Sequence, residues 1–147
     1  MGYSGQLTYT IDNDNRLLIP AKLRNHLFVD GEKGRVTITR GFDRNIIIFN
    51  QSQWKAFEES LYKYPRKGDY RKIINWFIGS SETVDVDSQG RIKIPEFLLK
   101  EFEIKKHVVI TKDKNALLLW DPDIYAEYVK TVRKDFEKIV DEMEMDF

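Results

Sequence analysis

The chain of 147 residues has the length of about one domain, and its 41% hydrophobic and 13% aromatic content is enough for an apolar core. It contains no cysteine, which excludes disulfides and thiolate metal sites. The 24 basic and 24 acidic residues cancel, so nucleic-acid binding through a uniformly basic surface is excluded too. No apolar run predicts a transmembrane helix.

The charges are unevenly distributed along the chain. Residues 121–147 hold nine acids and four bases, a net of −5, so the other 120 residues hold 20 bases and 15 acids, a net of +5. This asymmetry has two interpretations. Either the basic body carries the binding surface, or the acidic segment is a solvated amphipathic tail without a role in partner choice.

The first third of the chain predicts a strand, a tight turn, a second strand as its hairpin partner, a short helix and two further strands. Alternation of apolar and polar residues marks the hairpin, and a fully apolar run marks the last strand as central and buried. The ranges are an irregular start at 2–5, strand 6–11, strand 16–19, helix 20–28, a turn-rich loop at 30–34, strand 36–39 and strand 46–49.

The remaining chain predicts a helical insert, a second set of strands and a long final helix. Asn50 can cap the first insert helix with Gln53 placed for a capping box, and Asp69 can cap the second. Asp121 and Pro122 begin the final helix, whose apolar stripe needs a partner on the insert or on another subunit. The ranges are helices 51–64 and 70–78, strands 84–86 and 91–94, helix 95–102, strands 108–111 and 117–120, and helix 122–143.

One unit occurs twice in this order. The pattern apolar-Asp-x-x-x-Arg-apolar-x-Ile-Pro-x-x-Leu begins at Ile11 and again at Val86, with every match at an offset of 75 residues. An ordered set at constant offset indicates an internal duplication. In each copy the Asp can accept backbone N–H groups and start a turn, and Asn15 or Gly90 can take the left-handed conformation before the Arg.

The unit resembles the SpoVT-AbrB family, whose members share a D-x-x-G-R-[apolar]-x-I-P-x-x-L-R hairpin and helix. Two tandem copies around a helical insert resemble its MraZ branch. The resemblance covers nearly the whole chain, including Met1–Gly5, Gly41–Asp43, Ile46–Phe49, Trp54 and Leu117–Trp120. It implies an α+β fold in which two tandem, pseudo-equivalent AbrB-like units form a small β-barrel-like body with a helical insert and a C-terminal helix. The implied division is 1–50, 51–80, 81–121 and 122–147.

The resemblance also implies a function. MraZ proteins are cytoplasmic, nucleoid-associated regulators of transcription that assemble into rings. They bind short DNA repeats upstream of the bacterial division and cell-wall genes. The chain is therefore expected to bind duplex DNA as a homo-oligomer, with a repressor role, and to need no cofactor, membrane or small-molecule substrate.

The resemblance carries DNA-binding roles onto particular residues. Because only the first copy keeps the Arg after the helix Leu, as Arg24 against Leu99, the first copy is expected to face DNA. Each turn Arg can instead clamp its own turn by pairing with the Asp four residues back, and Lys22 can be simply solvated. The residues predicted to contact DNA are Arg16, Arg24, Asn13, Asn15, Lys22 and Arg91.

The first turn departs from the family pattern, which is commonly D-x-K-G-R. Here Asp14 stands in the Lys place and Asn15 in the Gly place. An acid beside DNA lowers affinity through phosphates. Either other residues compensate for this loss of affinity, or the DNA sequence that the chain prefers differs from that of its relatives.

An enzyme is not predicted. His26 and His107 lack ligand spacing, and no glycine-rich phosphate loop or nucleophile elbow is present. Paired aspartates in duplicated halves are typical of aspartic proteases, but Asp12 and Asp87 lack the Asp-Thr/Ser-Gly context of that chemistry. The alternative from a different class is a ring-forming structural or protein-interaction module that has lost DNA binding.

Overall fold

The computed structural model describes residues 8–29 and 34–146. The expected irregular start at 2–5 and residues 30–33 of the expected loop lie outside this range. The fold is α+β, as predicted. In chain order the elements are β1 (Thr8–Thr10), β2 (Arg16–Leu18), α1 (Ala21–Leu27), β3 (Arg35–Arg40), β4 (Ile46–Asn50), α2 (Gln51–Leu61), α3 (Gly68–Ile78), β5 (Glu82–Asp85), β6 (Arg91–Lys93), α4 (Glu96–Glu101), β7 (His107–Asp113), β8 (Ala116–Trp120) and α5 (Pro122–Met143).

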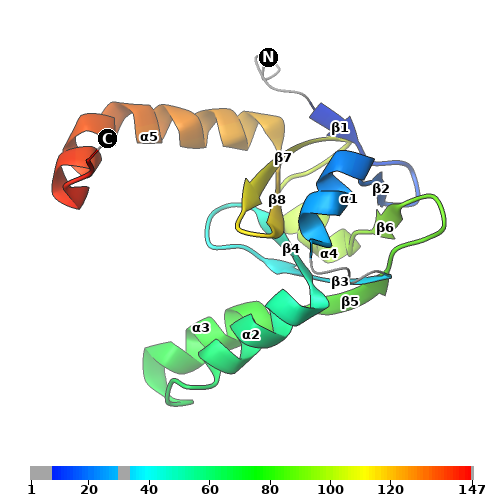
Figure 1. Cartoon of the computed structure of the whole chain (residues 1–147), viewed down its shortest axis with the longest axis horizontal. Helices are drawn as coiled ribbons and strands as arrows, with labels where there is room; N and C mark the ends of the chain where they lie inside the picture. Colours follow the sequence, from blue (N-terminus) through cyan, green and yellow to red (C-terminus); the bar gives the residue numbers. More distant parts are fainter. Residues whose placement is uncertain (1–7, 30–33, 147) are drawn as a thin grey trace.

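Six strands form one antiparallel sheet in the order β1-β7-β8-β4-β3-β5 (Figure 1). The other two strands, β2 and β6, pair only with each other and form a separate ribbon, named here the β2–β6 ribbon. The sheet order follows the duplication. Exchanging each strand for its equivalent in the other repeat (β1 for β5, β3 for β7, β4 for β8) gives the same order reversed, which is a pseudo-twofold arrangement.

The two repeats interlock, and this corrects the predicted local hairpin. Residues 16–19 do not form a ladder with β1, because β1 pairs with β7 of the other repeat and β2 pairs with β6. Only an isolated bridge between Ile11 and Leu17 links the two strands of the first turn. Period-two alternation specifies which face of a strand is buried, and equivalent strands of two repeats satisfy that pattern as well as neighbouring strands do.

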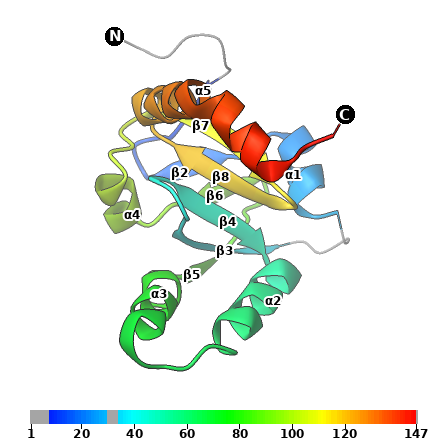
Figure 2. The ribbon, with the colours of Figure 1, turned by 90° about the vertical axis from the view of Figure 1, so that its left-hand side faces the viewer.

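The main core lies between the sheet and a layer made of the β2–β6 ribbon, α1 and α4. Leu17 and Ile92, paired at the centre of the ribbon, are 0% and 1% exposed, and Ile48 of β4 faces the same cluster. The opposite face of β4 carries Ile47 and Phe49, which pack against α2. Strand β4 is therefore covered on both faces, as its apolar run predicted (Figure 2).

The expected barrel is not closed. Within the described residues, the six-stranded sheet ends at β1 on one side and at β5 on the other, and each of these pairs with a single neighbour. The two strands that the prediction placed in hairpins belong instead to the β2–β6 ribbon, so the body is an open sheet with a ribbon across one face.

The helix caps agree with the sequence in part. The Asn50 side chain accepts a bond from the backbone N–H of Gln53 at 2.8 Å, and Asp121 caps α5 in the same way. The capping box is not completed, because the buried Gln53 Oε1 has no partner among the described residues. Asp69 is wrong as a cap, since α3 begins at Gly68 and its N-cap is Lys67.

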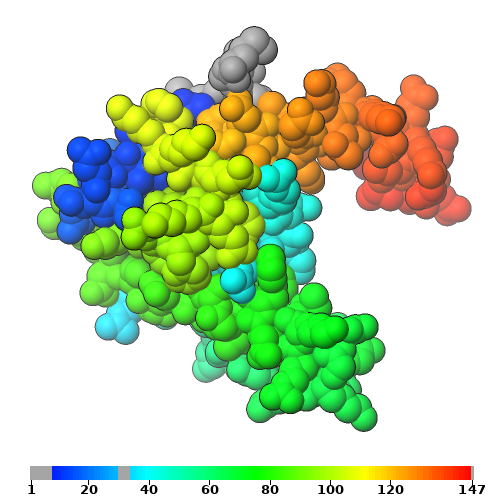
Figure 3. Space-filling model, turned by 180° about the vertical axis from the view of Figure 1, so that it is seen from behind, coloured from blue at the N-terminus to red at the C-terminus, as the bar shows by residue number. Residues whose placement is uncertain are grey.

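Two helical arms leave the body. The first is the α2–α3 hairpin and the second is α5, and Figure 3 shows both projecting from the same side of the molecule. The β2–β6 ribbon lies on the other side, away from both arms (Figure 1). Helix α5 has no buried residue, so of the two predicted partners for its stripe, packing on the insert is not observed.

Candidate nucleic-acid interface

The two turns that precede β2 and β6 are built by the same bonds. In the first turn, Asp12 Oδ1 accepts the backbone N–H groups of Asp14 and Arg16, each at 2.9 Å. In the second turn, Asp87 Oδ1 accepts those of residues 89 and 91 at the same distances. Both aspartates are therefore turn formers, as the sequence indicated.

Each turn contains a left-handed residue at the predicted place. Asn15 has a φ of 62° and Gly90 a φ of 83°. Their carbonyls accept bonds across the pseudo-twofold axis, from the Ile94 N–H to Asn15 at 2.8 Å and from the Ile19 N–H to Gly90 at 3.0 Å. Asn15 thus has a structural role, because its backbone joins the first turn to the end of β6.

The two turn arginines differ in their partners. Arg91 Nε donates to Asp87 Oδ2 at 2.8 Å, which is the predicted clamp on its own turn. Arg16 does not pair with Asp12; its Nη1 donates to the exposed Asp14 at 3.2 Å instead. Asp14, the residue that departs from the family pattern, therefore partly neutralises the leading DNA-contact candidate.

The outer face of the β2–β6 ribbon gathers three cations. Arg16 stands opposite Lys93, and Leu18 stands opposite Arg91, with all four side chains on the face away from the core. Leu18 is 51% exposed. Lys93 and Leu18 were missed at the sequence level. The alternation that turns Leu17 inward could have found them, because it turns both of these outward.

Arg24 is used inside the fold. Its Nη1 donates to the Ile19 carbonyl at 2.7 Å, and its guanidinium lies where a side chain at position 90 would begin. Its equivalent in the second repeat, Leu99, is buried. Arg24 therefore lies beneath the second turn. Its side chain is partly buried, and the predicted contact with a DNA phosphate depends on the part that stays exposed.

The other predicted contacts are more accessible. Asn13 is exposed at the tip of the first turn, and Lys22 is exposed on α1 just after β2. Within the described residues neither makes an ion pair. The structure therefore brings Arg16 and Arg91 onto one face, with Asn13 at its edge.

The turns also set the acidity of their aspartates. The backbone N–H bond from Arg16 lowers the pKa of Asp12 below its ordinary value, and the bond from Arg91 does the same for the pKa of Asp87. Burial opposes the shift in both. Both carboxylates are thus charged at neutral pH, and a charged acceptor holds the two N–H groups more strongly than a neutral one.

The described residues offer neither a metal-ligand cluster nor a membrane-spanning helix. Across residues 8–29 and 34–146, no three His, Asp or Glu side chains gather as metal ligands would. None of the described helices has the length and apolar content needed to span a lipid bilayer.

The comparisons with known proteins agree with the duplication. The sequence profile of the MraZ protein family matches the chain twice, over residues 3–71 and 77–147. A protein of Caldanaerobacter subterraneus named transcriptional regulator MraZ is 33% identical over 141 residues, covering 95% of both chains. Proteins of the same name from Oenococcus oeni and a Thermoanaerobacter species are 33% and 31% identical, covering 96% and 95% of both chains. The name describes a regulator rather than an enzyme, and the chain belongs to the MraZ family.

Proposed function

We propose that this chain is a transcriptional regulator that binds duplex DNA through the outer face of the β2–β6 ribbon. The observation that carries the proposal is the ribbon itself, a two-stranded antiparallel element with three cations and an exposed leucine on one face. A β-ribbon fits the major groove of B-DNA, where base pairs present distinct donor and acceptor patterns.

Each outward side chain has a chemical role in this proposal. Arg16 presents a guanidinium that can form paired bonds to the O6 and N7 of guanine, once it leaves Asp14. Arg91 keeps its two terminal nitrogens for phosphate while Nε holds Asp87. Lys93 adds a second phosphate contact, and Leu18 can contact a thymine methyl group.

The finer expectations belong to the same proposal. The target is a set of short repeats upstream of the bacterial division and cell-wall genes, and the effect is repression. The protein acts in the cytoplasm on the nucleoid. The names of the relatives support regulation of transcription. Leadership by the first repeat is supported by Arg16, whose guanidinium, unlike that of Arg91, is not held by the Asp that builds its turn.

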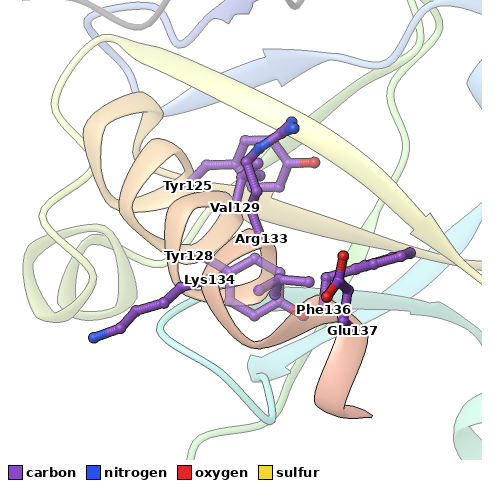
Figure 4. A pocket seen from close by; sticks show the side chains of 8 residues that line it. Tyr125, Tyr128, Val129, Arg133, Lys134, Phe136 and Glu137 are labelled. Carbon is purple, nitrogen blue, oxygen red and sulfur yellow. The ribbon is translucent and has the colours of Figure 1, made fainter. Parts of the chain in front are cut away.

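Assembly into a homo-oligomeric ring is part of the proposal. Helix α5 is anchored at its start, where Tyr125 and Tyr128 contact Trp120 at ring distances of 5.2 and 4.7 Å. Beyond this point Val132, Phe136 and three further apolar residues of the stripe and tail are 38% to 62% exposed. The side chains between Tyr125 and Glu137 line a hollow of about 730 Å³ on α5, and Figure 4 shows these side chains along the helix. An apolar face of this length on a rigid arm is suited to a second copy, in a heterologous contact that can close into a ring.

The deciding experiment is a mobility-shift titration with DNA from immediately upstream of the protein's own gene. Saturable binding that survives an excess of unrelated duplex supports the proposal. An intact oligomer with no shift on any DNA, even at low salt, would favour the alternative of a ring-forming structural module.

A further inference from the structure

We propose that the tip of the α2–α3 hairpin is a second, sequence-independent contact for DNA phosphates. The tip is residues 62–72, and every one of them is exposed. It holds five basic residues and one acid, a net of +4 in a chain whose total is zero. The basic residues are Lys63, Arg66, Lys67, Arg71 and Lys72, and the acid is Asp69.

Most of the basic side chains of the tip form no ion pair within the described residues. The single acid of the tip pairs with Lys72 at 3.5 Å, with both side chains at least 80% exposed. The other four cations form no ion pair with any described residue. Arg66 and Arg71 line one hollow of about 320 Å³, together with Tyr62. Two guanidiniums around one hollow suit an oxyanion such as a phosphodiester.

Aromatic side chains arrange these cations. Arg66 lies over the ring of Tyr62 at 4.4 Å, a cation–π contact that holds its guanidinium in place. Tyr64 and Tyr70 stack on each other at 5.5 Å and 19°, and both are more than half exposed. These rings do not serve the core. They give the tip flat surfaces and phenolic hydroxyls, which bond phosphate and sugar oxygens.

The tip is held in a defined place on the body. Arg40 of β3 stacks on Trp76 of α3 at 4.6 Å and donates to Glu101 of α4 at 3.0 Å. Phe77 of α3 contacts Phe57 of α2 at 5.1 Å, which fixes the two helices together. The tip and the β2–β6 ribbon lie at different ends of the molecule (Figure 1). They therefore reach different stretches of DNA.

The inference rests on the proposed function, because bound DNA is the polyanion that this regulator meets. Phosphate contacts supply sequence-independent affinity and make binding salt-dependent. The tip thus adds to the affinity for flanking DNA without changing the sequence preference. Anionic lipid is the competing partner for a basic, aromatic tip, and the test includes it.

The test compares two variants with equal change in net charge. The tip variant carries Gln at Lys63, Arg66, Lys67 and Arg71, and the control variant carries Gln at four exposed cations elsewhere. The control positions are Lys105, Lys106, Lys112 and Lys130. Affinity for a duplex of unrelated sequence is measured across a salt series, with oligomeric mass checked for each protein. We expect the tip variant to lower the slope of log K against log salt by about 2 to 4, and the control variant to lower it much less.

The outcomes separate this inference from the proposed function. Equal slopes for the two variants would overturn the inference, and so would loss of binding to phosphatidylserine vesicles with DNA binding unchanged. If the wild-type protein binds upstream DNA and Arg16→Ala removes its sequence preference while the tip variant matches the control, only the inference fails. If the wild-type protein binds no DNA, the proposed function fails first.

Discussion

The two repeats share a backbone plan but differ in what they leave exposed. Their turns use the same aspartate bonds, and two sets of equivalent strands, β2 with β6 and β4 with β8, pair with each other. The second turn is closed, because Arg91 pairs with Asp87 and Arg24 of the first repeat lies against Gly90. The first turn is more open, because the Arg16 guanidinium pairs with the exposed Asp14 rather than with Asp12.

The helices that follow β4 and β8 repeat this contrast. Helix α2 packs Trp54 on Phe49, and Phe57 stacks on the same ring at 5.2 Å, so its apolar face is covered by the sheet and α3. Its equivalent, α5, packs only its first turns on Trp120. Duplication produced two similar backbones whose helices α2 and α5 differ in how far their apolar faces are covered. In our proposal the first repeat leads DNA binding, and the exposed face of α5 in the second repeat carries assembly.

The largest effect is expected on α5. Phe136→Asp places a charge in the exposed apolar stripe, so the proposed oligomer should dissociate to a monomer at micromolar concentration. Light scattering measures the mass. Lys130→Gln, on the opposite face of the helix, changes the net charge equally and should leave the mass unchanged. Retention of the full mass by Phe136→Asp would show that α5 is not the assembly face.

The two turn arginines test the contrast directly. Arg16→Ala is expected to cost about 1–3 kcal/mol of discrimination between upstream and unrelated DNA. Arg91→Ala should reduce DNA affinity less and lower the melting temperature, because it opens the clamp on Asp87. Mobility shift and thermal unfolding measure the two effects. Loss of binding in a folded Arg91→Ala oligomer, with Arg16→Ala intact, would reverse the assignment of the repeats.

Asp14→Lys restores the charge common in the family and releases Arg16 from its ion pair. Affinity for duplex DNA should rise on the order of tenfold at low salt, because the local charge changes by two. The same titration in high salt should show a smaller gain. Asp85→Lys is the control. Asp85 lies on the edge strand β5, and its replacement breaks the exposed ion pair with Arg35 of β3, so DNA affinity should change little.

The left-handed residues predict a smaller difference in stability. Gly90→Ala should cost about 1–2 kcal/mol, because the left-handed φ of 83° at this position disfavours alanine. Asn15→Gly, at the equivalent position, should change stability by about 0.5 kcal/mol or less, because both residues accept this conformation. Urea unfolding measures both. If Gly90→Ala lowers the free energy of unfolding by the same amount in the Arg24→Ala protein as in the wild type, the contact between the two positions does not contribute to that loss.

The smallest effect concerns acid. The folded pKa values of Asp12 and Asp87 lie below their ordinary value of 3.8, so their stabilisation is complete above about pH 4 and is lost as pH falls through the lowered pKa. The melting temperature should therefore fall below pH 4. Asp87→Asn, whose side-chain oxygen still accepts N–H bonds, should flatten that decline. If the melting temperature of Asp87→Asn falls below pH 4 as steeply as that of the wild type, other carboxylates dominate the acid sensitivity.

The sequence by itself determined the duplicated unit, the α+β class and most elements. The 75-residue offset, the Asp and Asn or Gly of each turn and the caps at Asn50 and Asp121 are local signals, and local hydrogen bonds satisfy them. These features need no knowledge of which strand meets which, so they could be predicted.

Only the tertiary structure decided how the repeats combine. Alternation cannot distinguish pairing within a hairpin from pairing across the duplication, so the β2–β6 ribbon and the open sheet were not foreseen. For the same reason Lys93 and Leu18 were missed on the candidate interface, and the contact of the Arg24 guanidinium with Gly90 of the other repeat was not foreseen, while its DNA contact stays a prediction. A contact between residues 66 positions apart depends on packing, which no local pattern encodes.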